Sequence, residues 1–411
     1  MSQNTFIDYP TEDEILEWYS LNGSNIVHKV NNHFHTPFSF SSFDDIKQIF
    51  ELARREEIKV LGINDFYTTA GFEEFNELSI EYKLFPCFNI EFMGLHKDMQ
   101  KANIRVNDPN NPGRTYLSGK GLNFPAKLEK ASEKKLEGLL IESAKQTEGM
   151  LNLVAEHIGK IDPDLILDKK MVYKNYTKGM LRERHIARAI REVIQQKYQN
   201  EKDQRAILKE IYGKKASKSD LNNNAELEAE IRSMLLKSGG VAYVKESPKA
   251  FLEVAEVLKI ITDAGGIPTY PVLLDDINGN YTEFERDMEK LYNDLSSMNI
   301  YSLELIPGRN NIERLEEFVS FFHDRNFIIS FGTEHNTPEM IPLKISAREG
   351  VPLSEYLNRV SFEGVCVIAA HQYSKARGKD GYIDKNGKVR LQHKDEFIEL
   401  GNAVIEYFLQ N

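Results

Sequence analysis

The chain has 411 residues, a formal net charge of −11 at pH 7 and a hydrophobic fraction of 41%. This length exceeds that of an average domain and predicts either a large barrel or a core domain with an insertion. The acidic balance argues against a phosphate-backbone footprint spread over the whole surface, so a nucleic-acid partner is not expected. A small anionic substrate held in a local cationic pocket fits this composition.

The two cysteines, Cys87 and Cys366, both lie inside apolar runs. We therefore expect buried free thiols in a reducing compartment rather than a disulfide or a cysteine-ligated zinc. The first fifteen residues are polar and acidic and lack the apolar segment of a signal peptide, and no apolar run is long enough to span a membrane. These features predict a cytoplasmic protein without a membrane partner, and they favour no particular oligomeric state.

The first third of the chain alternates apolar runs with helical patterns. We expect strands in NIVHKVNNHFH, EIKVLGIND and LFPCFNIEF, since continuous apolar runs are typical of parallel strands covered by helices. A helix is expected over 43–57, with Ser42 as its N-cap and acidic residues in its first turn. Its predicted apolar face consists of Ile46, Ile49, Phe50 and Ala53.

The pattern changes between 125 and 245, where charges become dense and only helical periodicity survives. One predicted helix there places Ile186, Ile190, Val193 and Ile194 on a single face. Strand–helix units resume directly afterwards, in IPTYPVLL, IYSLELIPG and FIISFGTEH. We therefore predict an α/β fold, as a doubly wound sheet or a (βα) barrel, whose first part is 1–124, whose helical insertion or cap is 125–245, and whose second part with a C-terminal extension is 246–411.

Two histidines stand one residue apart at the end of the first predicted strand. His33 and His35 point to the same face, because side-chain direction in a strand repeats every two residues. In barrel enzymes the site lies at the carboxyl ends of the strands. At the ends of the other predicted strands are Asp65, Glu91, Tyr270, Glu304, Arg309, Glu334 and His335. Imidazole and carboxylate ligands without cysteine predict a site for Mn, Zn or Fe.

The order of these motifs resembles the polymerase and histidinol phosphatase (PHP) superfamily of metal-dependent phosphoesterases. That family has H-x-H-T/S-x-x-S, T-D-H-D, G-I-E-I, A-H-P and G-S-D-x-H motifs, and this chain has HFHTPFS, INDFYTTAGF, NIEF, GGIPTYP and GTEH in the same order. The stretch NYTKGMLRERHIARAI is similar to a helix of the family branch in which a helical insertion covers the site. The resemblance covers about residues 26–340 and implies a distorted (βα)7 TIM-like barrel with a helical cap.

Several family ligands are replaced in this chain. Phe66 and Tyr67 stand in the second motif, Tyr270 replaces the A-H-P histidine, and Tyr116 stands where a further histidine is usual. Glu334 takes the place of the aspartate of G-S-D-x-H, and His335 comes one residue early. The resemblance thus implies a reduced metal site formed by His33, His35, Glu91 and Glu334, which would hold one or two ions.

The remaining candidate residues are assigned from the chemistry of such a site. Asp65 or His335 would orient or deprotonate a metal-bound water. A phosphorylated substrate requires cations near the mouth, and His371, at the end of the apolar run VIAAHQY, would end another barrel strand. The expected substrate-binding side chains are Arg114, Lys120, Arg184, His185, Tyr270, Arg309 and His371.

Three functions are compatible with this pattern. The leading expectation is a metal-dependent hydrolase acting on a small phosphorylated substrate, with nucleotides among the candidates. Alternatively, the aromatic replacements suit a non-phosphate hydrolase or lyase with a sugar-like or carbonyl substrate. The loss of several ligands also agrees with a binding protein whose catalytic site has decayed.

Overall fold

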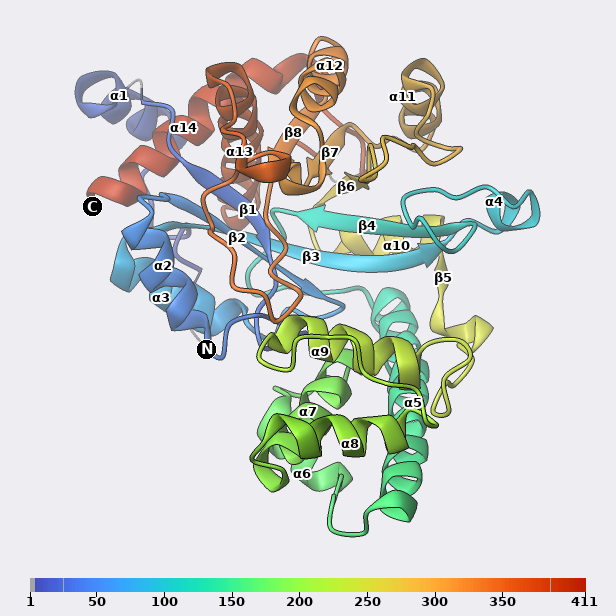
Figure 1. The fold of residues 1–411 in the computed structure, drawn as a ribbon. Coiled ribbons are helices and arrows are strands. Elements are labelled where there is room, and N and C mark those ends of the chain that lie inside the picture. The colour runs from blue at the N-terminus through green and yellow to red at the C-terminus, as the bar shows by residue number, and fades with distance from the viewer. Residues whose placement is uncertain (1–3, 25, 385) are drawn as a thin grey trace.

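The computed structural model describes residues 4–24, 26–384 and 386–411. Its centre is a barrel-shaped sheet surrounded by helices, and a separate group of helices lies at one end (Figure 1). The sheet path runs β1-β2-β3-β4-β6-β7-β8. Its strands are β1 (Val30–Phe34), β2 (Val60–Phe66), β3 (Phe85–Leu95), β4 (Arg114–Lys120), β6 (Ile267–Val272), β7 (Ser302–Leu305) and β8 (Ile328–Phe331). The predicted α/β barrel is confirmed, and β1 covers only the second half of the predicted first strand.

Strand β4 runs opposite to the other barrel strands. β1, β2 and β3 are parallel, as are β6, β7 and β8, whereas β4 is antiparallel to both β3 and β6. The connection from β3, which includes the short α4 (Lys97–Lys101), starts and ends at the mouth, so β4 enters the barrel from there. Arg114 consequently lies at the mouth and Lys120 lies inside the barrel.

The barrel is nearly closed between β8 and β1. One parallel bridge joins Phe34 and Glu334. The backbone N–H groups of Thr333 and Glu334 both donate to His33 O at 3.0 Å, and His35 N donates to Glu334 O at 2.7 Å. These bonds fix the segment after β8 directly beside the two histidines. The two-residue β5 (Leu252–Glu253) pairs with the end of β3 outside this path.

Helices cover the outside of the barrel, and the C-terminal pair contributes much of this layer (Figure 1). α13 packs on β8 and β1, and α14 packs on α13 and α1. Glycines allow this close packing, since a side chain at Gly364 would collide with the Ile329 carbonyl. The helices are α1 (Glu12–Asn22), α2 (Ile46–Arg55), α3 (Phe72–Tyr82), α10 (Val254–Asp263), α11 (Met288–Ser297), α12 (Ile312–His323), α13 (Glu355–Ala376) and α14 (Lys394–Gln410), with short 3-10 turns at Pro248–Ala250, Pro307–Arg309, Arg348–Gly350 and Leu391–His393.

The helix expected over 43–57 is shorter than predicted. It is α2, and its predicted apolar face is buried. Its N-cap is Asp45, whose side chain accepts from Gln48 N, so the assignment of Ser42 as the cap is wrong. An aspartate here satisfies a free backbone N–H and places negative charge at the positive end of the helix dipole, which a serine three residues earlier does not do.

The described residues 121–251 contain helices and no strand. This part, called the cap below, has its own apolar cluster, which includes Ile186, Ile190 and Ile194. Its helices are α5 (Lys130–Ile161), α6 (Lys169–Tyr176), α7 (Glu183–Lys197), α8 (Glu201–Ile211), α9 (Asn224–Ile231) and the π-helix η1 (Arg232–Leu236). The predicted domain boundaries at 125 and 245 stay a prediction, and these helices all lie between them. Among the described residues, none of the helices combines the length and the hydropathy that a membrane span requires.

Candidate functional site

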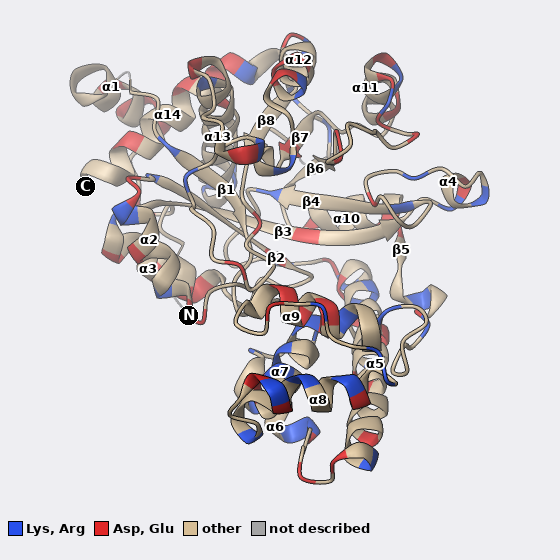
Figure 2. Cartoon of the chain, viewed as in Figure 1, with Lys and Arg blue, Asp and Glu red and all other residues tan. Residues whose placement is uncertain are grey.

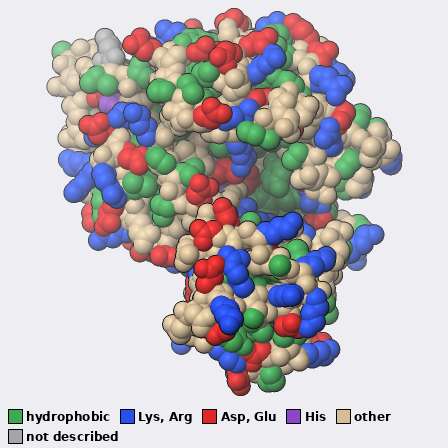
Figure 3. All heavy atoms as spheres, in the orientation of Figure 1, with side chains coloured by type: hydrophobic (Ala, Val, Ile, Leu, Met, Phe, Trp, Pro, Cys, Tyr) green, Lys and Arg blue, Asp and Glu red, His purple; other side chains and the backbone are tan. Residues whose placement is uncertain are grey.

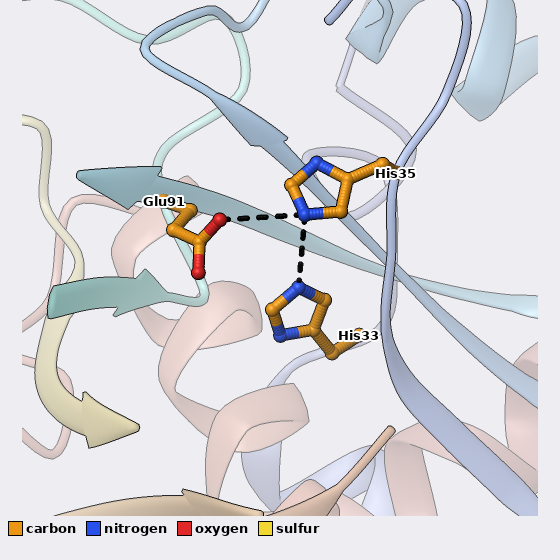
Figure 4. Close-up of side chains that lie close together, drawn as sticks. All are labelled: His33, His35 and Glu91. Atoms are coloured by element: carbon orange, nitrogen blue, oxygen red, sulfur yellow. Dashed lines mark hydrogen bonds and ion pairs between the residues drawn. The ribbon is translucent and has the colours of Figure 1, made fainter. Parts of the chain in front are cut away.

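Three buried side chains meet at the mouth of the barrel. His33 belongs to β1, His35 follows that strand, and Glu91 lies on β3 (Figure 4). The Nε2 atoms of the two histidines are 3.3 Å apart, and His35 Nε2 lies 3.3 Å from Glu91 Oε2. One potential ligand atom from each residue lies within 4.8 Å of those of the other two. The barrel thus brings together two imidazoles from the end of β1 and one carboxylate from β3.

The outer ring nitrogens of both histidines have partners of their own. His33 Nδ1 lies 2.8 Å from Glu304 Oε1 on β7. His35 Nδ1 lies 3.1 Å from Ser39 Oγ, and that hydroxyl donates to Asp65 Oδ1 at 2.6 Å. Both Nδ1 atoms therefore act as N–H donors, which leaves a lone pair on Nε2 of each neutral ring. The two Nε2 atoms face one another, and the amide nitrogen of Asn64 lies 3.1 Å from that of His33.

This geometry fits a bound divalent ion. Two imidazole nitrogens that each lie about 2.1 Å from one ion at a tetrahedral angle would be roughly 3.4 Å apart, and the observed separation is 3.3 Å. A carboxylate that supports each outer nitrogen directly or through a hydroxyl is typical of metal-binding histidines. Imidazole and carboxylate ligands suit Zn, Mn or Fe.

Protons compete with an ion at this site. Burial alone would lower the pKa of His35, but the hydrogen bond and charge of Glu91, together with Asp65 and Glu334, raise it overall. The raised pKa favours the imidazolium at His35. Metal binding at this position therefore releases a proton.

Asp65 supports the loop that carries His35 rather than facing the cavity. Its Oδ1 accepts from Thr36 N at 2.7 Å and from the Ser39 hydroxyl, and its Oδ2 accepts from the Thr36 hydroxyl. Burial raises the pKa of Asp65, and His35 with these donors offsets only part of that rise. Because both carboxylate oxygens are occupied, Asp65 is better placed to hold Ser39 and His35 than to deprotonate a water molecule.

Glu334 lies beside the cluster, but its carboxylate is directed elsewhere. It forms an ion pair with Arg309, and its Oε2 accepts from Asn336 Nδ2 at 2.7 Å. Burial would raise the pKa of Glu334, but Arg309 and the two histidines lower it. The expected ligand Glu334 and the expected substrate-binding residue Arg309 thus bind one another, and Glu334 is not part of the close three-residue group.

His335 is enclosed by the loop that follows β8. Its Nδ1 lies 2.8 Å from Thr333 Oγ1, and its Nε2 lies 2.9 Å from the carbonyl of Ile341. Burial lowers the pKa of His335 to about 4. Because both ring nitrogens are occupied within the loop, His335 is better placed to hold this loop than to deprotonate a water molecule.

A cavity of about 230 Å³ extends from His35 and Glu91 to the cap. A hollow is visible where the cap meets the barrel, with basic side chains on its rim (Figure 3). Farther from the cavity, α8 carries basic and acidic residues side by side, and acidic residues stand on α9 (Figure 2). The basic side chains that line the cavity are Arg114, Arg182, Arg184, Arg232 and Lys237, against the acidic Glu91, Glu183 and Glu246. This excess of positive charge suits an anionic ligand.

The basic side chains differ in their partners. Arg114 forms an ion pair with Glu246, and Glu183 pairs with Arg232 at 3.2 Å and with Lys237 at 2.8 Å.

Arg182 and Arg184 have no carboxylate within ion-pair distance among the residues that the structure describes. The Arg182 guanidinium instead lies 4.4 Å from the ring centroid of Phe66. Burial lowers the pKa of Arg184 to about 10, so it stays charged at neutral pH. These two cap arginines are available to bind an anion.

Two expected substrate-binding residues do not line the cavity because of strand direction and register. Lys120 is fully buried inside the barrel and forms an ion pair with Glu304, since β4 descends from the mouth. The Thr269 hydroxyl donates to Ser302, which lies on the same face of the sheet as Glu304. Because side chains alternate along a strand, Tyr270 points to the opposite face, away from the barrel interior. The Tyr270 hydroxyl donates to Glu285 at 2.8 Å.

Two expected histidines have structural positions. His185 is buried at the start of α7, where its Nδ1 accepts from Arg182 N at 3.0 Å, and burial with two nearby arginines lowers its pKa to about 3. His371 lies in the middle of α13, so the expectation that it ends a strand is wrong. It contacts the Gly265 carbonyl, which precedes β6 at the opposite end of the barrel from the cavity.

The sequence reasoning missed four residues that shape the site. Ser39 belongs to the H-x-H-T-x-x-S motif but has no predicted role, and no role is predicted for Arg182. Glu304 was noted at a strand end without a role, and Asn64, whose amide lies 3.0 Å from His33 Nδ1, was not considered. Position near the carboxyl end of a strand is the signal that could have identified Asn64 and Glu304.

Comparison with known proteins supports the fold. No known family profile matches the chain, and a search of curated proteins finds no relative. A proposed metal-dependent phosphoesterase from Bifidobacterium adolescentis is 14% identical with a TM-score of 0.51, over 82% of this chain and 96% of that one. An amidohydrolase from Chromobacterium violaceum, solved with sulfate and no metal, is 15% identical with a TM-score of 0.45, over 78% and 93%. The first likeness shows a shared fold, and membership of the PHP superfamily stays a prediction.

Proposed function

We propose that the protein is a metal-dependent hydrolase that acts on a small phosphoester and holds its ion with His33, His35 and Glu91. The observation that carries the proposal is the pair of Nε2 atoms 3.3 Å apart, with both outer nitrogens committed to donating. The cavity above this group has basic walls, which suit a phosphorylated substrate.

A bound divalent ion would supply Lewis acidity and a water whose pKa lies near neutrality. The residues of the chain then have three tasks. Arg182 and Arg184 bind the anionic group of the substrate from the cap side, the aromatic rings of Phe66 and Tyr67 hold Arg182 in place, and the cap excludes bulk solvent from the reacting atoms.

Hydrolysis of a phosphoester panel with added Mn²⁺, Zn²⁺ or Fe²⁺ tests the proposal. We expect activity in the wild-type protein and a loss of at least 100-fold, about 3 kcal/mol, in His33→Ala. His323→Ala is the matched control, because His323 is partly exposed on α12 and pairs with Glu363 away from the cavity. Equal activity in wild type and His33→Ala would remove the phosphoesterase proposal.

A second candidate is a hydrolase or lyase with a neutral, sugar-like substrate. The observation that favours it is the group of aromatic side chains on the cavity wall, Phe40, Phe66, Tyr67, Tyr116 and Phe251. A thermal-shift screen separates the two candidates. Stabilisation by neutral sugars with no response to phosphorylated compounds would favour the second candidate, and the reverse pattern would favour the first.

A further inference from the structure

The barrel floor beneath the histidine pair holds an ion pair that has no contact with solvent. Lys120 and Glu304 are 0% and 1% exposed, and their charged groups are in direct contact. The Lys120 ammonium also lies 3.2 Å from Asn32 O and 3.4 Å from Asn64 Oδ1. Oxygen atoms therefore surround the ammonium inside the barrel.

The carboxylate of Glu304 joins this ammonium to His33. Its Oε2 faces Lys120, and its Oε1 lies 2.8 Å from His33 Nδ1 and accepts from the Ser118 hydroxyl at 3.1 Å. The four groups come from β1, β4 and β7, which lie far apart in the chain and are fixed by the sheet. Lys120 and Ser118 thus hold the carboxylate of Glu304 in place, and this carboxylate is the acceptor towards which His33 Nδ1 donates its proton.

Stability alone does not account for this arrangement. Removing two ions from water costs several kcal/mol for each ion, and apolar side chains of similar volume commonly replace a buried ion pair with no loss of stability. A carboxylate that takes the Nδ1 proton of a metal-binding histidine, by contrast, fixes its tautomer and ring orientation and raises the basicity of the other nitrogen.

We propose that Glu304 is a positioning residue of the metal centre, and that Lys120 anchors it. Glu304 accepts the Nδ1 proton of His33 and so directs the Nε2 lone pair at the ion. Lys120 keeps the carboxylate in this orientation. The proposal rests on the proposed metal site, and it assigns to Lys120 a role inside the barrel in place of substrate binding.

The test compares two charge-balanced double variants. Lys120→Met/Glu304→Leu removes the acceptor, and Lys120→Met/Glu304→Gln keeps a neutral one. The readouts are zinc affinity by isothermal titration calorimetry and the His33 tautomer from ¹⁵N NMR of the metal-free protein at pH 8. Glu285→Gln is the matched control, because Glu285 is a buried glutamate that hydrogen-bonds Tyr270 and not His33.

We expect the Leu variant to bind zinc about 10- to 100-fold more weakly than wild type and to show both His33 tautomers. The Gln variant should keep the Nδ1–H tautomer with a smaller loss of affinity, and the control should match wild type. A Leu variant with wild-type affinity and only the Nδ1–H tautomer would overturn the proposal.

Two further outcomes are also decisive. If the Leu variant does not fold, the Gln variant decides, since unchanged zinc affinity there would overturn the proposal and weaker affinity would support it. If the wild-type protein binds no zinc, the proposed function and the metal role of Glu304 both fail. The tautomer readout then still shows whether Glu304 orients the ring.

Discussion

Replacement of Ser39 by alanine should weaken metal binding without removing a ligand. The Ser39 hydroxyl lies 3.1 Å from His35 Nδ1 and donates to Asp65 at 2.6 Å, in a region with almost no solvent exposure. Without it, the buried Nδ1–H of His35 has no acceptor, and leaving such a donor unpaired costs about 1–3 kcal/mol. The ring can recover that energy by rotating or changing tautomer, which turns Nε2 away from the cluster. We therefore expect the zinc dissociation constant of Ser39→Ala to rise about 10- to 100-fold.

Titration calorimetry of Ser39→Ala against Ser41→Ala isolates this effect. Ser41 is buried in the same loop, but its hydroxyl donates to the backbone carbonyl of His35 at 2.7 Å and not to the ring. Both variants should lose a similar amount of thermal stability, and only Ser39→Ala should lose zinc affinity. Wild-type affinity in Ser39→Ala, or an equal loss in both variants, would refute the assigned orientation of His35.

Three other predictions concern the cap and the pH dependence. Arg182→Ala should lower kcat/KM for a phosphoester about 10- to 100-fold, mainly through KM, because a charge-assisted contact contributes about 1.5–3 kcal/mol. The zinc content of this variant should not change. The control Lys174→Ala, on the exposed face of α6, should behave as wild type. Zinc affinity should fall as the pH drops, because the raised pKa of His35 makes protons compete with the ion; a dissociation constant that is the same at pH 6 and pH 8 would contradict this. Burial lowers the pKa of His371 to about 4, so the unfolded chain binds a proton at this residue more readily than the folded protein does. The free energy of unfolding should therefore be unaffected by His371 above about pH 6.5 and should fall towards pH 4, by up to about 3 kcal/mol for this residue. Urea unfolding at pH 7 and pH 4.5 measures the change, and His371→Asn should show a smaller dependence if the assignment is correct.

The alternation of strands and helices could be predicted because hydrophobic runs and helical periodicity are local properties of the sequence. The direction of β4 could not, since the letters RTYLSGK describe a strand of either direction equally well. The direction of β4 depends on where the connection from β3 ends. This direction decides whether Arg114 or Lys120 faces the mouth. The apolar run VIAAHQY around His371 predicts a strand, but it lies in α13. A run of this length and composition suits a strand and the centre of a buried helix equally well.

The sequence predicts which types of residue form the candidate site and at which strand ends they lie. His33, His35 and Glu91 were expected to meet, and the structure places them together. The sequence did not show which acids bind a ligand and which bind another side chain. Glu334 pairs with Arg309, and Glu304 pairs with His33 and Lys120. Such choices depend on strand register and tertiary contacts, which no local pattern contains.

Metal analysis of the purified protein is the decisive test of the metal centre formed by His33, His35 and Glu91. The protein is prepared without chelators, analysed by plasma mass spectrometry and then titrated with Zn²⁺ and Mn²⁺, alongside His35→Ala and Glu91→Ala. We expect about one equivalent of a divalent ion in the wild-type protein and a sharp loss of binding in both variants. A wild-type protein that neither retains nor takes up a divalent ion, or a variant that binds it as tightly as wild type, would contradict the assignment of this group as a metal centre.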